Sequence, residues 1–354
     1  MDTGQGQDRN DSVAGGARGG SPWLGRGLLV GGVVLGLLFL TVGAIALVLV
    51  AGPSGKDGEG GRAADVERFE ERYVSGEGAD KIAILPITGV ISSQESSSLE
   101  SLETPTATPE TLRNELRQAA RDDSVKAVIL EVNSPGGSVV ASDQMHNNIQ
   151  DFKESTGKPV VVSMGETAAS GGYYISTAAD EIIANESTFT GSLGVIFSIL
   201  NYKDAEEKLG LQEEVFKSDE FKDLFSGSRE RTPEEKEIIQ NLINESYDQF
   251  VEVIVEGRGL PEDKVREIAD GRVYSGSQAE SLSLVDYLGD LDYATGRADE
   301  LAGIEDATAV RYRKGQGILG LLRARLAPPE SEALKALRVA GISPTPELQY
   351  LYRP

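Results

Sequence analysis

The chain has 354 residues, more than one average domain, and a formal net charge of −23 with an isoelectric point near 4.5. So acidic a balance excludes nucleic acid as an expected partner. The chain contains no cysteine, which excludes thiol nucleophiles and disulfides, and its only histidine is His146.

The first part of the chain predicts a membrane anchor. Residues 1–26 are rich in Gly and polar residues, a composition typical of a disordered tail. Gly27 to Gly52 is uncharged and almost wholly apolar, and as a helix rising about 1.5 Å per residue it exceeds the roughly 30 Å hydrocarbon core of a bilayer. We therefore expect one transmembrane helix. A cleaved signal peptide is the alternative, although its apolar region is normally only about 7–15 residues.

Residues 53–80 are expected to link this anchor to the main domain. Pro53 to Arg62 is a Gly-rich linker, and Ala63 to Tyr73 has the composition of a short charged helix. We place the main domain at residues 81–310, starting with a strand at Ile82–Ile87. Thr108 then predicts a helix N-cap with Pro109 at the first helical position.

Two units that each run strand, glycine turn and helix follow in tandem. The first has a strand at Ala127–Val132, the turn Asn133-Ser-Pro-Gly-Gly137 and a helix at about Ser138–Phe152. The second has a strand at Pro159–Met164, a turn containing Ser170 and a helix up to Ala179. Because loops of a parallel α/β sheet emerge at the same edge, the backbone N–H of Gly137 could face the Ser170 side chain.

Ser170 is a candidate nucleophile because it precedes a helix N-terminus, where unpaired N–H groups can stabilise an oxyanion. A tight strand–helix junction is the alternative.

A histidine base would have to be His146, which we expect to be a partly exposed helix residue. The remaining candidate bases are lysines, whose pKa would have to be lowered by burial. Spacing alone does not choose among Lys203, Lys208, Lys217 and Lys222.

Two later segments carry apolar faces. Thr232 and Glu235 form a predicted capping box at the start of a helix. One face of this helix is apolar and could serve as core or as a subunit contact. The residues of this face are Ile239, Leu242, Ile243, Tyr247, Phe250 and Ile254. Residues 311–354 form the expected C-terminal part. Its basic, Leu-rich segment at 317–326 could lie on an anionic membrane or pack against the protein body.

Ordered motifs in the chain resemble those of the signal peptide peptidase A family in its short bacterial form. The resemblance runs from Lys81 to Gly289, with a similar tail at Gln349–Arg353, and its motifs are Asn133–Gly137, Ala168–Tyr174, Thr190–Val195, Phe221–Arg229 and Gly271–Gly276.

The resemblance implies a role for particular residues. Ser170 would be the nucleophile, Lys222 the general base and Ser192 the hydroxyl that orients the lysine. The backbone N–H groups of Gly137 and Gly171 would form the oxyanion hole. Without the resemblance, Ser192 and Gly137 would be interpreted as turn residues and Lys222 as a solvated charge. Neighbouring acids at 219, 220 and 223 would raise the pKa of Lys222 if they paired with it, so they must point away.

The resemblance also implies a fold, an assembly, a cellular location and a class of substrates. Its fold is α/β, the Clp-protease/crotonase fold with repeated ββα units, here preceded by the single transmembrane helix. A chain with one catalytic copy is expected to form a homo-oligomeric ring in which Lys222 can serve Ser170 of a neighbouring subunit. The catalytic domain would lie on the extracytoplasmic side of the cell membrane and degrade remnant signal peptides and other apolar peptides at the bilayer. No cofactor or metal is implied.

Other functions remain open at this point. The fold also hosts acyl-CoA enzymes that use a similar oxyanion hole. A membrane protease acting on stomatin-like partners, or a scaffold that has lost its chemistry, would carry much of the same sequence pattern.

Overall fold

The computed structural model describes residues 68–94, 105–314 and 349–351, all within one compact unit, Asp65–Pro354. The predicted transmembrane segment Gly27–Gly52 and the basic segment at 317–326 lie outside these residues. None of the described helices is both long and apolar enough to cross a membrane.

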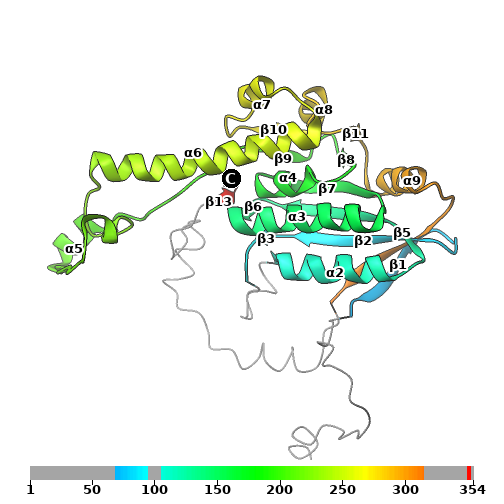
Figure 1. The fold of residues 1–354 in the computed structure, drawn as a ribbon, viewed down its shortest axis with the longest axis horizontal. Helices are drawn as coiled ribbons and strands as arrows, with labels where there is room; N and C mark the ends of the chain where they lie inside the picture. Colours follow the sequence, from blue (N-terminus) through cyan, green and yellow to red (C-terminus); the bar gives the residue numbers. More distant parts are fainter. Residues whose placement is uncertain (1–67, 95–104, 315–348, 352–354) are drawn as a thin grey trace, which may run out of the picture. The chain divides into compact units, whose positions relative to one another are not determined.

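A nine-stranded, mostly parallel sheet organises the described residues (Figure 1). Its strands in spatial order are β1 (Glu70–Ser75), β12 (Thr308–Arg313), β2 (Lys81–Thr88), β5 (Val125–Ser134), β7 (Val160–Ala169), β8 (Glu181–Ala184) and β11 (Tyr287–Leu288). The end of β7 leaves β8 and pairs with β9 (Phe189–Gly191), which pairs in turn with β10 (Val273–Ser275). Only the β1–β12 and β9–β10 pairs are antiparallel. This parallel-rich architecture confirms the α/β part of the predicted fold class.

A smaller sheet lies at the glycine turn of the first predicted unit. Its described strands in order are β13 (Gln349–Leu351), β6 (Gly136–Ser138), β3 (Val90–Ile91) and β4 (Thr106–Ala107). The C-terminal strand β13 runs antiparallel to β6 and pairs Tyr350 with Gly137. The tail is therefore part of the wall around this turn.

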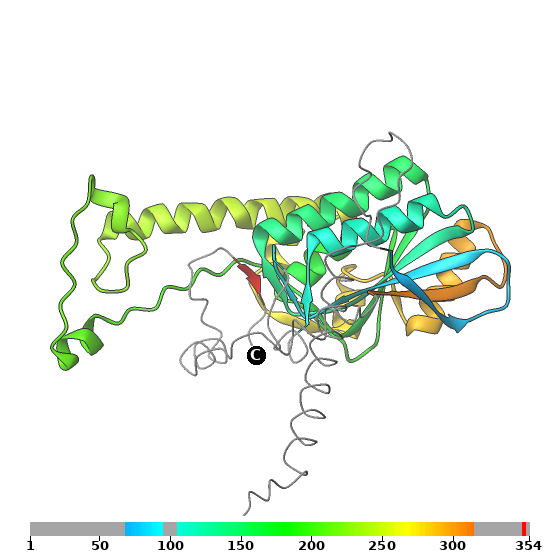
Figure 2. The ribbon, with the colours of Figure 1, turned by 90° about the horizontal axis from the view of Figure 1, so that it is seen from below.

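Helices cover both faces of the larger sheet (Figures 1 and 2). Alternate strand residues divide the core: Leu85 and Leu130 pack with α2 and α3, whereas Ile84 and Ile129 pack with α9 on the opposite face. The described helices are α2 (Pro109–Arg121), α3 (Val139–Thr156), α4 (Gly171–Ser176), α5 (Lys203–Leu209), the 3₁₀ turn η2 (Glu220–Asp223), α6 (Pro233–Arg258), α7 (Glu262–Ile268), α8 (Gly276–Ser281) and α9 (Leu291–Ala302).

Local helix signals were predicted correctly. The Thr108 side chain accepts a hydrogen bond from the Thr111 N–H at the start of α2. Thr232 and Glu235 form the reciprocal capping box of α6. The predicted helix at Ala63–Tyr73 is wrong where it is described, because Glu70–Ser75 is strand β1. Its pairing with β12, far away in the sequence, overrides the helical preference of its charged residues.

Residues 198–232, here called the arm, extend away from the sheet at the N-terminal end of α6 (Figures 1 and 2). Within the arm, the Tyr202 N–H donates to the Gly227 carbonyl at 2.8 Å. At its base the Phe197 and Phe225 rings lie 5.2 Å apart. Along α6, Phe250 and Ile254 are buried, whereas Leu242 is 41% exposed. The predicted apolar face of this helix therefore serves the core only in its C-terminal half.

Candidate functional site

Ser170 occupies a strained turn between β7 and α4. Its φ of 53° and ψ of −115° are unusual for a residue with a side chain, and such backbone costs roughly 1–3 kcal/mol. Its N–H donates to the Gly191 carbonyl at 2.8 Å, which fixes the turn against β9. The Ser170 Oγ is buried and has no hydrogen-bond partner among the described residues. Strain combined with an unsatisfied buried hydroxyl is characteristic of a functional site.

Ser192 lies beside Ser170 because of strand register. Strands β7 and β9 run parallel and pair Ala169 with Gly191, so each strand is followed at once by its serine. Ser192 has a φ of 50°, close to that of Ser170, and its N–H donates to the Arg272 carbonyl at 2.8 Å. The structure thus brings together two serines that the sequence separates.

The two glycine turns meet, as predicted. A methyl group added at Gly171 would lie 3.2 Å from the Gly137 nitrogen, and one added at Gly136 would lie 2.6 Å from the Gly171 nitrogen. Gly137 has no room for a side chain either, because its added carbon would lie 1.9 Å from the Ile91 carbonyl oxygen. Backbone of both turns therefore packs closely beside Ser170, the arrangement that an oxyanion hole requires.

Sequence reasoning missed Ser142, in the first turns of α3. Its Oγ is buried, has no hydrogen-bond partner among the described residues, and would lie 2.5 Å from a methyl group at Gly171. Two unsatisfied hydroxyls, those of Ser142 and Ser170, thus flank Gly171. The available signal was its place in the helix that begins directly after the Pro-Gly-Gly turn.

His146 is buried, with 4% exposure, so the prediction of a partly exposed residue is wrong. Its ring packs edge-on against Tyr174 at 5.4 Å, since this face of α3 lies against α4. Burial lowers the pKa of His146, an effect that nearby Asp143 partly offsets. The imidazole forms no hydrogen bond to Ser170.

Lys222 lies in η2, on the arm, and is exposed. One subunit does not bring it to Ser170. The arm is tied to the first turn of α6 by the Arg229–Glu235 ion pair, whereas α4 contacts this helix at Phe250 through Tyr174. At about 1.5 Å per residue, these two contacts are roughly 22 Å apart along the helix axis. Figures 1 and 2 agree, because α4 lies against the sheet and the arm does not.

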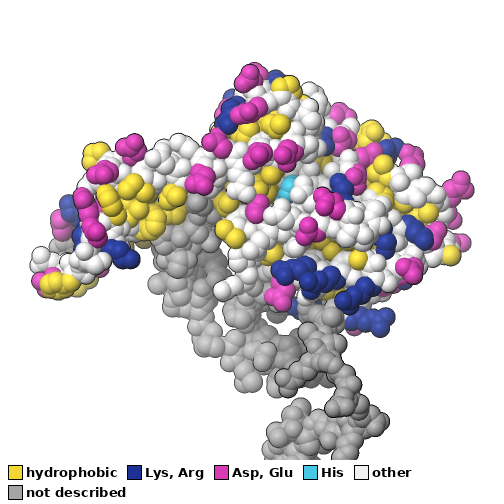
Figure 3. Space-filling model, in the orientation of Figure 1, with side chains coloured by type: hydrophobic (Ala, Val, Ile, Leu, Met, Phe, Trp, Pro, Cys, Tyr) yellow, Lys and Arg dark blue, Asp and Glu magenta, His cyan; other side chains and the backbone are white. Residues whose placement is uncertain are grey.

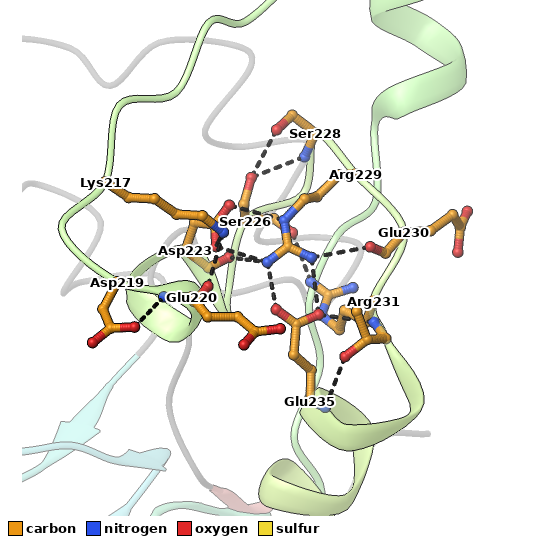
Figure 4. A network of polar contacts seen from close by, with 11 residues as sticks. Lys217, Asp219, Glu220, Asp223, Ser226, Ser228, Arg229, Glu230, Arg231 and Glu235 are labelled. Carbon is orange, nitrogen blue, oxygen red and sulfur yellow. Dashed lines mark hydrogen bonds and ion pairs between the residues drawn. The ribbon is translucent and has the colours of Figure 1, made fainter.

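Two of the acids near Lys222 in sequence, Asp219 and Asp223, form hydrogen bonds with other groups (Figure 4). Asp219 caps η2 by accepting the Glu220 N–H at 2.8 Å. Asp223 accepts from Arg229 and from Lys217, and these hydrogen bonds hold its pKa well below the usual range. No hydrogen bond or ion pair joins the Lys222 ammonium to any described residue. Asp219 and Asp223 thus have partners other than Lys222 within one subunit, and the orientation of the acids in an assembled site stays a prediction.

A cleft of about 320 Å³ opens next to Ser192. Its wall mixes apolar and polar atoms, from the β9 exit and α6 to the turn before β10, and it is lined by Ser192, Leu193, Gly194, Val195, Ile196, Tyr247, Ala269, Asp270, Gly271 and Leu351. The apolar part of this wall suits an apolar side chain of a bound peptide.

Comparisons with known proteins bear on the same residues. The sequence profile described as Peptidase family S49 matches residues 152–305, a stretch that includes Ser170, Ser192 and Lys222. A protein of Enterococcus faecium named "Putative signal peptide peptidase SppA" is 33% identical over 91% of this chain and 96% of its own length. "Protease 4" of Haemophilus influenzae is 38% identical over 66% of this chain and 36% of its own length. "Serine protease SPPA, chloroplastic" of Arabidopsis thaliana is 36% identical over 64% of this chain and 33% of its own length.

Proposed function

The chain belongs to the signal peptide peptidase A family of S49 peptidases and is a serine peptidase. From this premise we propose that Ser170 is its nucleophile and Lys222 its general base. The observation that carries the proposal is the Ser170 hydroxyl, which is buried, unsatisfied and held by a strained turn against two glycine loops. Ser192, its neighbour across the β7–β9 register, is positioned to orient the incoming amine.

The chemistry follows from these groups. Ser170 Oγ attacks the peptide carbonyl carbon while neutral Lys222 takes its proton, and the N–H groups of Gly137 and Gly171 stabilise the oxyanion. Collapse of this intermediate breaks the C–N bond, and the lysine returns the proton to the leaving amine. Water then attacks the acyl-enzyme carbonyl and loses a proton to Lys222. The acyl C–Oγ bond breaks, Lys222 returns the proton to the Ser170 Oγ, and the acid product leaves.

In the proposed enzyme the two groups come from different subunits of a homo-oligomeric ring. Support comes from the separation along α6 and from the surface of the arm, where Figure 3 shows hydrophobic side chains gathered. Phe216 is 87% exposed there, an arrangement that favours burial by a partner. The other exposed apolar side chains of the arm are Leu200, Tyr202, Leu209, Leu211, Val215, Phe221 and Phe225.

The finer assignments are part of the proposal. The domain adopts a Clp-protease/crotonase-like fold, is anchored in the cell membrane by Gly27–Gly52, and degrades remnant signal peptides on the extracytoplasmic side. Support comes from the apolar character of that segment, from the apolar side chains that line part of the cleft beside Ser192, and from the name of the Enterococcus faecium relative.

Peptide cleavage and fluorophosphonate labelling by the full chain in detergent test the proposal. Ser170→Ala and Lys222→Ala should each lower kcat/KM for an apolar peptide by at least about a thousandfold, since the two groups act as one unit. The probe should label wild type and not Ser170→Ala. As control, His146→Ala should keep most of the activity at a temperature where it remains folded. Substantial cleavage by Lys222→Ala would contradict the proposal, and a loss in His146→Ala as large as that in Ser170→Ala would indicate a histidine base.

A further inference from the structure

Three acidic residues lie within three positions of Lys222 in the sequence, and Arg229 binds one of them, Asp223. Arg229 holds Asp223 with a two-pronged contact, Nε to Oδ2 at 2.9 Å and Nη2 to Oδ1 at 2.7 Å. Lys217 adds a third bond to Asp223 Oδ1 at 2.7 Å and also donates to the Glu220 carbonyl at 2.8 Å. The carboxylate next to Lys222 in sequence is thus fully engaged by other cations (Figure 4).

The other edge of the Arg229 guanidinium is fixed to α6. Its Nη1 donates to Glu235 Oε2 at 2.8 Å, and its Nη2 donates to Glu235 Oε1. Glu235 is 1% exposed and belongs to the capping box, where its Oε2 also accepts the Thr232 N–H at 2.8 Å. Arg229 is therefore a rigid bridge, because a planar guanidinium bound at both edges has little freedom to turn.

This bridge matters for a lysine base. A carboxylate within about 4–6 Å of an ammonium raises the pKa of the lysine by stabilising its charged form, whereas the reaction needs the neutral amine. The charged groups around η2 are Asp219, Glu220 and Asp223 on the turn itself, Lys217 before it, Arg229, Glu230 and Arg231 after it, and Glu235 on α6. Of the acids, Asp223 is adjacent to Lys222 in sequence and is the one bound by two cations.

We propose that Arg229 is a positioning residue for the general base: it holds the Asp223 carboxylate away from Lys222, so that the lysine can become neutral where it meets Ser170. The inference rests on the proposed role of Lys222. It assigns to Arg229 an effect on the protonation of the base, in addition to its contact with the cap of α6.

The test is the pH profile of kcat/KM for the full chain, whose acidic limb reports the pKa of the free base. Arg229→Gln should move this limb to higher pH by about one unit. At pH values below the limb, kcat/KM should then fall about tenfold, and at pH values above the limb it should equal that of wild type. Adding Asp223→Asn to Arg229→Gln should return the limb to its wild-type position. Arg231→Gln is the matched control, because Arg231 donates to the Ser226 carbonyl at 2.9 Å and pairs with no described carboxylate, so its limb should not move.

Two outcomes would overturn the inference. If Arg229→Gln lowers activity equally at every pH, or if Asp223→Asn fails to restore the limb, Arg229 acts only through the structure of the arm. Circular dichroism and native mass of each variant identify a loss of fold or assembly, and Arg229→Lys, which keeps the charge, then replaces Arg229→Gln in the comparison. Lys222→Ala is assayed in parallel: an active Lys222→Ala refutes the base itself, whereas an inactive one with an unmoved Arg229→Gln limb refutes only the positioning role.

Discussion

Gly171 illustrates how closely the site is packed at the level of single residues. It lies between the unsatisfied hydroxyls of Ser142 and Ser170, and the Gly137 nitrogen is next to the space where its side chain would be. An N–H donor must approach an oxyanion within hydrogen-bond distance, so a site of this kind leaves no volume for a methyl group. The absence of a side chain at residue 171 is thus a requirement of both packing and chemistry.

Gly171→Ala should therefore lower kcat/KM by about a hundredfold or more, a loss comparable to that of one oxyanion donor. The reason is the 2.5 Å approach of the new methyl group to Ser142 Oγ, which forces the turn to shift. Peptide cleavage measures the effect. Gly296→Ala, in α9 with nothing within 4 Å of the added carbon, is the control and should retain wild-type activity. Full activity in Gly171→Ala would show that the site accommodates a methyl group at residue 171, and would contradict the packing argument.

Sequence alone could predict the residues at the centre of the site, and it could not predict their surroundings. The turns that carry Ser170 and Gly137 were predicted to approach each other because glycine turns after parallel strands share a sheet edge, and the structure packs Gly137 beside Gly171, the residue after Ser170. Ser142 carries no local signature, since a serine inside a helix is ordinary. The burial of His146 depends on α4 packing over α3, a contact that the sequence of α3 does not encode by itself.

At the scale of elements, helices that are defined by signals within a few residues could be predicted from the sequence. Strands that depend on pairing with distant segments could not. The α3 helix was predicted at Ser138–Phe152 and spans Val139–Thr156, ending at Gly157 in the left-handed conformation. Strand β1, by contrast, exists because β12 pairs with it across more than two hundred residues of sequence. The division of α6 into a buried half and an exposed half likewise depends on where the sheet ends.

The first turn of α6 should make the arm sensitive to acid. Arg229 lowers the pKa of Glu235 from 4.5 to about 2, chiefly through its hydrogen bonds. Because the folded-state pKa is the lower one, the carboxylate stabilises the fold fully above pH 4.5, and this contribution is lost as the pH falls toward about 2.

Urea unfolding of wild type and Glu235→Gln at pH 7 and pH 3 tests this expectation. Glu235→Gln should lower the free energy of unfolding at pH 7, and the difference from wild type should shrink at pH 3 because wild type is then losing its charged pair. Glu237→Gln, on an exposed position of the same helix, should show no such difference at either pH. A Glu235→Gln deficit that is equal at both pH values would mean that the pair does not titrate as described.

The whole molecule separates its proposed reactive groups. Ser170 is buried against the sheet, whereas Lys222 is exposed on an arm whose apolar side chains have no cover within the described chain. A head-to-tail ring would place the arm of one subunit over the serine of the next and bury those side chains, completing one site per interface. Subunit number and substrate sequence are properties of that assembly, so neither follows from a single chain.

Mixing two inactive variants tests the central claim most directly. Subunits of Ser170→Ala and of Lys222→Ala, each inactive alone, are exchanged in equal amounts, and cleavage of an apolar peptide is measured. Sites formed between neighbours predict recovery to about one quarter of wild-type activity, because one interface in four then joins an intact Ser170 to an intact Lys222. Ser170→Ala mixed with the double variant should stay inactive. If the two single variants exchange subunits and no activity returns, the site is not shared between subunits and the account is contradicted.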